Sequence, residues 1–311
     1  MKVGILIQRA FVDKFEAKAL LESFKNKGFL AELVIVEELN YVLNPKDNEN
    51  PVRLFYKGKD LKDSFDVFLV REIFSKLKHT ILAIKILRKS GALVIDNNLE
   101  REQYVVNKLR EGTELLLGGV RFPKTYAVLT LEEYLDNLSY IKDFLGYPLL
   151  VKHNSRGKGS GIFKVENEKE LVNLLKKIHQ EDPKKAIKRY HLQEFLYLEA
   201  DYRVLVVGEK VLGAMQRIPK KGEFRANFSL GGSVKPVDLT HEMEQIANKA
   251  IRATNTVFAG VDIVYTLDNT YYVLEVNRTP GFEGFTNAHG INVADKFVEY
   301  VTKRWKKRKG M

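Results

Sequence analysis

Two carboxylates and an amide occupy neighbouring segments of the chain that have the composition of strands. In the segment YYVLEVN, Glu275 and Asn277 project from one face, because side chains alternate along a strand. The preceding segment GVDIVYT carries Asp262. The dipeptide Asp268-Asn269 predicts a two-residue turn, since both residues tolerate positive φ. That turn would place Asp262 directly opposite Glu275.

These three side chains form a possible donor set for magnesium. Facing carboxylates repel each other across a sheet, and a buried carboxylate or amide costs free energy unless something binds it. Carboxylate and amide oxygens are hard ligands that suit Mg²⁺ bound together with phosphate. A solvated strand face with chance charges is the alternative. Apolar neighbours favour the metal: Val261, Ile263, Val264, Leu274 and Val276.

A glycine-rich loop could bind phosphate. In LLVKHNSRGKGSGIF, an apolar strand ends at Lys152 and is followed by Gly157, Gly159 and Gly161. Backbone N–H groups of such a loop can surround phosphates, and a lysine at the strand end can reach them as a point charge. The pattern is not a Walker A loop. A surface turn would look the same, so both interpretations stay open for the loop alone.

Arginines follow on the next predicted strands. Arg203 lies in DYRVLVVG and Arg217 in VLGAMQRI, among apolar residues, while Arg225 and Asn227 lie on the connection FRANFSLGG. Arginines around a magnesium site suggest a clamp for a triphosphate and a carboxylate. A surface position is the alternative for each of them.

The segment QEFLYLEAD offers a place for a nucleotide. Backbone groups of Glu194 and Phe195 could bind adenine, with Phe195 packing on the ring. Asp201 could accept hydrogen bonds from ribose hydroxyls. An ordinary strand edge explains the same residues equally well on local grounds.

Composition excludes several classes of protein. The 311 residues include no cysteine, which excludes disulfides, zinc–thiolate sites and thiol catalysis. No apolar run approaches the roughly 20 residues of a membrane span, and the N-terminus has the pattern of a first strand, so a cytoplasmic protein is expected. The net charge is +11, with six basic residues in 303–309. An acidic partner could account for this tail, but a solvated helix end is favoured.

The elements that must position these residues predict an α/β (α+β) fold. Residues 1 to about 100 alternate strands and helices, which indicates an open α/β layer, and the first strand is not followed by a GxGxxG fingerprint. From Tyr190 onward the pattern is consecutive strands with one helix, HEMEQIANKAIRAT. This part predicts an antiparallel sheet.

Taken together, the motifs resemble the ATP-grasp superfamily and, within it, the RimK-type carboxylate–amine ligases. The similar stretches are QEF, DYRVLVVGEKVLGAMQRI, FRANFSLGG, AGVDIV, LEVNRTPGFEGF and GINVADKFVEYV, in this order. The resemblance implies an N-terminal α/β domain at 1–103, a central lid domain at 104–190 and a C-terminal domain with the magnesium site at 191–311. ATP would lie between the last two, under a lid loop at 153–161.

Residue roles follow from the resemblance. ATP binding is implied for Lys108, Lys152, Gly157, Gly159, Ser160, Gly161, Gln193, Glu194, Phe195, Asp201 and Arg203. Catalytic roles are implied for Arg217, Arg225 and Asn227, and metal binding for Asp262, Glu275 and Asn277. Two Mg²⁺ ions are expected, for which Mn²⁺ could substitute. The sequence departs from the family at Asn107, often an aspartate, and at Arg278, commonly a serine.

The implied activity is ATP-dependent amide formation through an acyl phosphate, with glutamate as the amine. The acceptor would be a protein C-terminus or a glutamyl-type group, and the basic surface would suit an acidic protein or peptide. Alternatives are a glutamate ligase for a pterin or deazaflavin coenzyme and a carrier-protein-dependent ligase of lysine or arginine biosynthesis. A basic nucleic-acid-binding protein and a regulatory nucleotide-binding protein are alternatives of a different class, but no aromatic–basic platform or helix-turn-helix is present. The resemblance leaves a homo-oligomer open.

Overall fold

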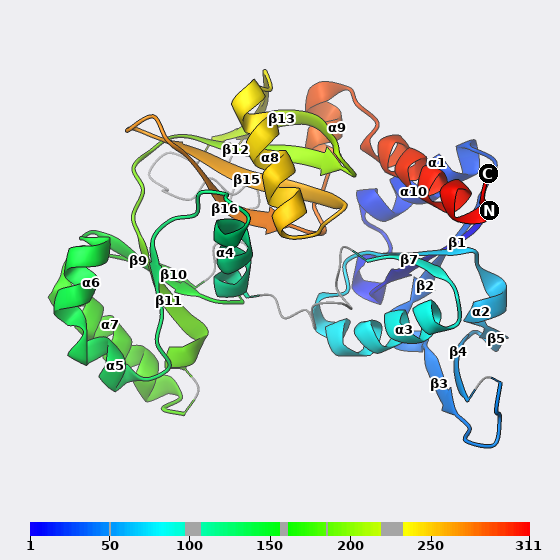
Figure 1. Cartoon of the computed structure of the whole chain (residues 1–311), viewed down its shortest axis with the longest axis horizontal. Coiled ribbons are helices and arrows are strands. Elements are labelled where there is room, and N and C mark those ends of the chain that lie inside the picture. The colour runs from blue at the N-terminus through cyan, green and yellow to red at the C-terminus, as the bar shows by residue number, and fades with distance from the viewer. Residues whose placement is uncertain (50, 97–106, 156–160, 185, 219–232) are drawn as a thin grey trace.

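The computed structural model describes residues 1–49, 51–96, 107–155, 161–184, 186–218 and 233–311. Figure 1 shows three lobes in a row: the central part of the chain at one end, a twisted antiparallel sheet in the middle, and the lobe that contains both chain ends at the other end. Helices and strands mix in every lobe, as the predicted α/β (α+β) class requires. Short 3-10 turns join some elements: Arg9–Phe11, Val36–Glu38, Phe74–Lys76 and Ile187–Arg189.

The N-terminal lobe is built on a parallel sheet. Its strand order is β2-β1-β6-β7, with β1 Lys2–Ile7, β2 Leu30–Ile35, β6 Val67–Val70 and β7 Leu93–Ile95. Val3 and Ile5 of β1 share a core with α1 (Phe15–Asn26). Leu6 shares the core on the other face with α3 (Leu77–Lys89). Both faces are covered, as is usual for parallel sheets.

A small antiparallel sheet follows β2, and the sequence pattern does not predict it. It consists of β3 (Asn40–Leu43), β4 (Val52–Tyr56) and β5 (Lys59–Asp60), followed by the short helix α2 (Leu61–Ser64). Most of β3 is exposed, so its apolar pattern is weak. Buried residues of β4 and α2 extend the core under α3.

The middle lobe is a five-stranded antiparallel sheet in the order β14-β13-β12-β15-β16. Its strands are β12 Leu198–Val207, β13 Lys210–Ile218, β14 Ser233–Val237, β15 Phe258–Thr266 and β16 Tyr271–Asn277. Successive side chains of β12 point to opposite faces of the sheet and enter two different hydrophobic cores. Val204 and Val206 pack with α8 (His241–Ala253), whereas Leu205 joins a core that contains residues of α9 (Glu283–His289) and α10 (Val293–Lys309).

The central lobe has its own sheet and its own core. The strand order is β10-β9-β11-β8, with β8 Thr125–Tyr126, β9 Leu149–His153, β10 Ile162–Val165 and β11 Tyr190–Glu194. Three helices pack on it: α5 Leu131–Asp136, α6 Leu138–Leu145 and α7 Glu168–Glu181. Strand β11 pairs with β9, so the first of the predicted C-terminal strands belongs to this sheet.

Two helices pack on lobes that are distant in sequence. Helix α4 (Lys108–Leu117) follows the N-terminal lobe, but Leu115 enters the core of the middle lobe, and α4 lies against β16 (Figure 1). Helix α10 returns to the N-terminal lobe, where Val298 and Val301 share a core with Val3 and Ile5. The division at 103 and 190 stays a prediction, and the cores group α4 with the middle lobe.

The β15–β16 hairpin corrects the predicted turn. Thr266 donates its backbone N–H to the Thr270 carbonyl at 3.0 Å, which leaves a three-residue turn at 267–269, with Asn269 at a φ of 58°. The two-residue turn is therefore wrong. The ladder nevertheless pairs Asp262 with Glu275, as predicted, because one residue of β16, Leu274, has no partner in the pairing and forms a bulge. The bulge compensates for the longer turn.

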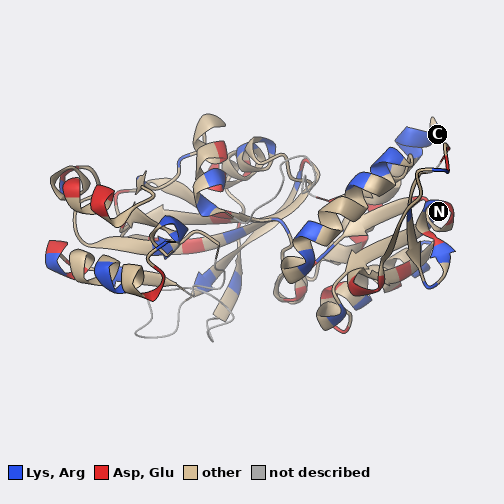
Figure 2. Ribbon diagram, turned by 90° about the horizontal axis from the view of Figure 1, so that it is seen from below, with Lys and Arg blue, Asp and Glu red and all other residues tan. Residues whose placement is uncertain are grey.

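The basic tail forms the end of α10, as the solvated-helix interpretation expects. Figure 2 shows bands of lysine and arginine along this helix. Its last turn contains Lys306, Lys307, Arg308 and Lys309, where cations suit the helix dipole. In the described ranges, no helix is long and apolar enough to cross a membrane.

Candidate active site

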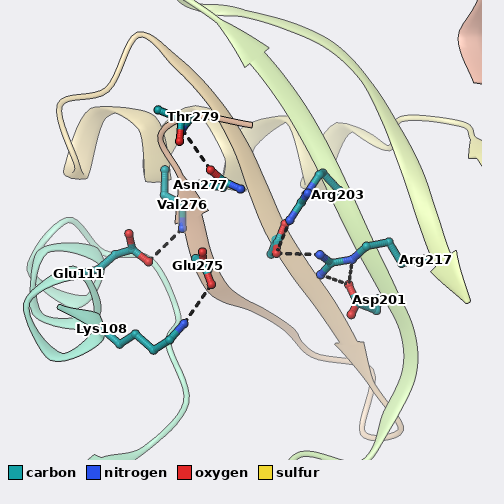
Figure 3. Close-up of polar contacts among 10 residues, drawn as sticks. Lys108, Glu111, Asp201, Arg203, Arg217, Glu275, Val276, Asn277 and Thr279 are labelled. Carbon is teal, nitrogen blue, oxygen red and sulfur yellow. Dashed lines mark hydrogen bonds and ion pairs between the residues drawn. The ribbon is translucent and has the colours of Figure 1, made fainter. Parts of the chain in front are cut away.

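Four alternating charges lie side by side on one face of the middle sheet, on β12, β13 and β15 (Figure 3). Arg203 donates two hydrogen bonds to Asp262, from Nε to Oδ1 at 2.8 Å and from Nη2 to Oδ2 at 2.9 Å. Arg217 donates from Nη1 to Asp262 Oδ2 at 2.8 Å and from Nε to Asp201 Oδ1 at 2.9 Å. Strand pairing creates the network, because Arg203 is the cross-strand neighbour of Asp262 and Arg217 that of Asp201.

This network keeps Asp262 ionised. Burial alone would raise the pKa of the Asp262 carboxyl, but Arg203 and Arg217 outweigh burial and lower that pKa to about 2. Burial dominates at Asp201, whose pKa rises to about 6 although Arg217 opposes the shift. In this structure both arginines, which are predicted to contact ATP and the reacting groups, hold the carboxylate of a candidate metal ligand.

A glycine makes room for the network. Gly260 on β15 pairs with Asn277 on β16. A Cβ atom at Gly260 would lie 3.2 Å from Arg203 Cδ and 3.3 Å from Pro280 Cβ. A larger residue at this position would therefore press on Arg203, which holds Asp262.

Helix α4 brings two ionisable side chains against β16 (Figure 3). Lys108 Nζ lies 3.0 Å from Glu275 Oε2, and Glu111 Oε1 accepts the Val276 N–H at 3.0 Å. Burial would lower the pKa of Lys108, but the Glu275 carboxylate raises it overall. Lys108 is thus a charged group within contact of a candidate metal ligand.

The residue before Lys108 starts the helix. The Asn107 side-chain oxygen accepts the Leu109 N–H at 2.9 Å, which is the bond of an N-cap. Asparagine caps helices as well as aspartate does, so this departure from the family leaves the start of α4 intact. The Lys108 N–H donates to the Asn154 carbonyl at 2.9 Å and joins α4 to the segment after β9.

Glu111 is a site residue that lies outside the motifs singled out in the sequence. Burial and the nearby Glu275 carboxylate raise the pKa of Glu111 to about 8, although the Val276 N–H and Lys108 oppose the shift. The carboxyl is therefore mostly neutral at pH 7. Its position three residues after Lys108 places both on one helix face, which is the sequence signal that could have identified it.

We expect Glu111→Gln to stabilise the protein at pH 8.5 and to change its stability little near pH 5. The folded state holds the Glu111 proton up to about pH 8, whereas the unfolded chain loses it near the ordinary value of 4.5. Wild-type stability therefore falls as pH rises through this window, by at most about 1.4 kcal/mol per pH unit, and glutamine removes that loss. Urea unfolding followed by Trp305 fluorescence at both pH values measures the difference. The same difference at pH 5 and pH 8.5 would contradict the raised pKa.

The candidate metal ligands are neighbours, and their oxygens fit Mg²⁺. Asp262 and Glu275 are a cross-strand pair, and Asn277 Oδ1 accepts the Thr279 N–H at 3.1 Å where the strand ends (Figure 3). Arginine N–H groups occupy three of the roughly four lone-pair positions of the Asp262 carboxylate, which leaves one for a cation. The described residues contain no cluster of three or more His, Cys, Asp or Glu that could hold a metal. The proposed site therefore depends on the Asn277 amide as third ligand.

Lys152 is a partly buried residue of β9 in the central lobe. Its Nζ donates to Gln193 Oε1 at 2.5 Å, and Gln193 donates to Thr125 at 3.0 Å. Burial and the charge of Lys108 lower the pKa of Lys152 to about 7. The cross-strand neighbour of Lys152 is His191, whose pKa burial lowers to about 3, so this imidazole is neutral. An anion near Lys152 would restore its charge.

The predicted adenine segment is partly occupied by contacts within the protein. Glu194 donates its N–H to the Lys124 carbonyl at 3.0 Å, and its side chain accepts the Lys124 N–H at 2.7 Å. The Phe195 ring packs edge-on against Tyr197 and lies 4.5 Å from the Lys164 ammonium. The roles of Glu194 and Phe195 in adenine binding stay predictions.

Several predicted residues lie outside the described residues: Gly157, Gly159, Ser160, Arg225 and Asn227. Gly161 is described and has a φ of 74°, which favours glycine. Its carbonyl accepts the His153 N–H at 2.9 Å. This bond joins β9 to the end of the predicted phosphate loop.

The fold and the charged site together indicate the class of protein to which this chain belongs. The model of the RimK-like ATP-grasp domain matches residues 106–301, and the chain belongs to this family. It is an ATP-grasp ligase, from a family that uses ATP and Mg²⁺. The resemblance stated from the motifs is confirmed.

Curated relatives align with nearly the whole chain. The probable alpha-L-glutamate ligase 2 of Shewanella amazonensis is 28% identical over 303 residues, which cover 97% of this chain and 96% of the relative. The tetrahydromethanopterin:alpha-L-glutamate ligase of Methanosarcina acetivorans is 29% identical over 334 residues, with coverage of 96% and 98%. Both relatives are named as ligases of glutamate.

Solved structures confirm the fold. The ATP-grasp ligase PsnB complexed with its minimal precursor superposes with a TM-score of 0.71 at 14% identity, over 97% of this chain and 98% of that one. The RimK domain protein ATP-grasp from Sphaerobacter thermophilus gives 0.69 at 19% identity, over 96% and 99%.

Proposed function

We propose that this protein joins L-glutamate to a carboxylate acceptor, with ATP converted to ADP and phosphate. The observation that supports the proposal most strongly is the likeness to alpha-L-glutamate ligases over 97% of the chain. The charged site agrees with it, because Asp262, Glu275 and two lysines gather where a nucleotide and a cation would need them. Structural relatives that bind precursor peptides favour a peptide or protein acceptor.

Three residues would hold the metal in this proposal. Asp262, Glu275 and Asn277 present hard oxygens from β15 and β16. Bound Mg²⁺ neutralises phosphate charge and orients the phosphoryl group for transfer. Arg203 keeps the Asp262 carboxylate ionised and fixes its direction. Lys108 balances Glu275 from the side of α4.

The other charged residues act on the substrates. Lys152 and Lys108 bind the phosphates of ATP, and the charge of Lys152 is restored on contact with the anion. The acceptor carboxylate takes the γ-phosphoryl group and ADP leaves, after which the amine displaces phosphate from the acyl carbon and loses a proton. Arg217, together with Arg225 and Asn227, is proposed to stabilise the charge on the acyl oxygen and on the leaving phosphate.

A second acceptor class is a glutamyl group on a pterin-type coenzyme. The relative from Methanosarcina acetivorans carries this acceptor in its name and is 29% identical to the chain, against 28% for the Shewanella amazonensis relative. Identity therefore does not separate the two acceptors. Both acceptors would use the same ATP chemistry, and the mass of the product distinguishes them.

The test is ADP release with Mg-ATP and each of the twenty amino acids, with and without nucleotide-depleted cell extract. We expect release that depends on L-glutamate, together with an acceptor that gains glutamate units in the mass spectrum. Glu275→Ala should lose this activity, whereas Glu132→Ala, an exposed residue of α5, should retain it. Full turnover in Glu275→Ala would show that the metal site is assigned wrongly.

A further inference from the structure

The N-terminal sheet has a topological switch point between β1 and β6. The chain passes from β1 to β2 on one side and returns to β6 on the other, which gives the order β2-β1-β6-β7. In open parallel sheets, ligands bind beyond the carboxyl ends of the two strands at which the order reverses. In this chain, Gln8 follows β1 and Arg71-Glu72 follows β6.

Three polar residues are buried at this point. Gln8, Arg71 and Glu72 are 5%, 3% and 4% exposed. Glu72 has a φ of 45°, in the left-handed region that side chains rarely adopt. The other described non-glycine residues with positive φ are exposed, so Glu72 differs from them in being buried. Strained backbone of this kind occurs preferentially at ligand sites.

Arg71 faces the segment that follows Asn277. Its Nη2 donates to the Pro280 carbonyl at 2.9 Å, and its guanidinium lies 4.9 Å from the centre of the Phe258 ring. Nε and Nη1 are buried and have no hydrogen-bond partner among the described residues. These nitrogens carry three of the five N–H donors. Burial lowers the pKa of Arg71 to about 10, so the group is charged at pH 7.

The neighbouring carboxylates are engaged elsewhere. Glu16 on α1 accepts the N–H groups of Phe282 at 2.9 Å and Glu283 at 3.4 Å. Glu72 accepts from Lys14 at 3.0 Å. Both carboxylates are close enough to act on Arg71 through their charge. A ligand with an ammonium and a carboxylate suits a site that combines the Arg71 cation with these carboxylates. A multiply charged phosphate would be repelled by the two carboxylates.

We propose that Arg71 binds a non-reacting carboxylate of the amino-acid substrate, between the switch point and the segment 278–283. The inference rests on the proposed ligase function and adds the residue that recognises the amino acid. Pro280, which Arg71 contacts, stands three residues after Asn277. An amino acid bound at Arg71 would therefore lie near the proposed metal site, with its amine free to reach the acyl group.

The test measures binding with the full-length protein, Mg²⁺ and a non-hydrolysable ATP analogue. Calorimetry gives dissociation constants for L-glutamate and two amide analogues. L-glutamine lacks the side-chain carboxylate of glutamate, and L-isoglutamine lacks the α-carboxylate. In the wild type, we expect one amide analogue to bind on the order of 10- to 100-fold more weakly than glutamate. Arg71→Met should weaken the binding of glutamate by the same factor and leave the affinity for that analogue unchanged. Arg71→Lys should recover part of the affinity.

Comparing the effect of Arg71→Met on glutamate and on its amide analogues separates recognition of a carboxylate from a structural role. If Arg71 only supports Pro280 and Phe258, Arg71→Met weakens all three amino acids equally, which would overturn the proposal. Arg53→Met is the matched control, because Arg53 is a partly exposed arginine on β4 of the same lobe. Its affinities should equal those of the wild type.

Subsite and ligase function can fail separately. Glutamate-dependent ADP release in the wild type, with normal glutamate binding in Arg71→Met, would refute the subsite and leave the ligase standing. Glutamate binding that is lost in Arg71→Met, without turnover under any mixture, would support the subsite and refute the ligase. Absence of glutamate binding by the wild type would refute the subsite directly.

Discussion

Asp262→Asn should lower the rate of ADP release on the order of 10³-fold, by analogy with the loss of other charge-stabilising groups. The substitution keeps the shape of the side chain and removes its charge. A candidate metal ligand is lost, and Arg203 and Arg217 lose the carboxylate that both of them contact. Initial rates measured against Mg²⁺ concentration should show a higher Mg²⁺ requirement.

The same variant should be less stable, by about 3–5 kcal/mol, because removing one partner leaves buried charges uncompensated. Urea unfolding followed by Trp305 fluorescence measures this loss. Asp201→Asn is the comparison, since Asp201 also contacts Arg217 but is not a candidate metal ligand. An unchanged Mg²⁺ requirement in Asp262→Asn, with equal losses of activity in both variants, would mean that Asp262 acts through the arginines alone.

Lys152→Met should weaken ATP binding on the order of 10²-fold and abolish its pH dependence. In the wild type, burial and Lys108 lower the Lys152 pKa to about 7, and contact with phosphate should raise it again. Below pH 7 the lysine is already protonated, so no proton is needed. Above pH 7 ATP binding takes up a proton, so wild-type affinity should fall as pH rises from 7 towards 9.

Calorimetry of Mg-ATP binding at pH 6.5 and 8.5 measures this proton uptake, when each experiment is repeated in two buffers with different ionisation enthalpies. Lys142→Met, on the exposed side of α6, is the control and should behave as the wild type. If wild-type binding heat is independent of the buffer at pH 8.5, Lys152 is not the proton acceptor.

Local patterns predicted the hairpin that carries the candidate metal ligands. The apolar alternation of β15 and β16 is strong, and the pairing of Asp262 with Glu275 is confirmed. The prediction of a two-residue turn is wrong. Asp268-Asn269 is a good two-residue turn on its own, but the pairing in the sheet favours a three-residue turn and a bulge at Leu274. Turn propensity is a weak local preference that the sheet can override.

The partners of buried charges could not be predicted in this way. The sequence pattern predicts strands for Arg203 and Arg217, but their contacts with Asp262 depend on the order in which the strands pair. Glu111 and Arg71 meet β16 and Pro280 across more than 160 residues of sequence. Periodicity reports which face of an element is apolar, and it contains no information about which distant element covers that face.

The distribution of the hydrophobic cores determines which parts of the chain can unfold separately. One core joins residues of the N-terminal sheet to the middle sheet and α10, while the central lobe encloses a core of its own. The central lobe can therefore open or unfold without exposing the apolar interior of the rest, as a separate cooperative unit. Trp305 is partly buried and packs against the shared core, so its fluorescence reports on these two lobes and not on the central lobe. A single midpoint temperature would then not correspond to one two-state unfolding equilibrium of the whole molecule.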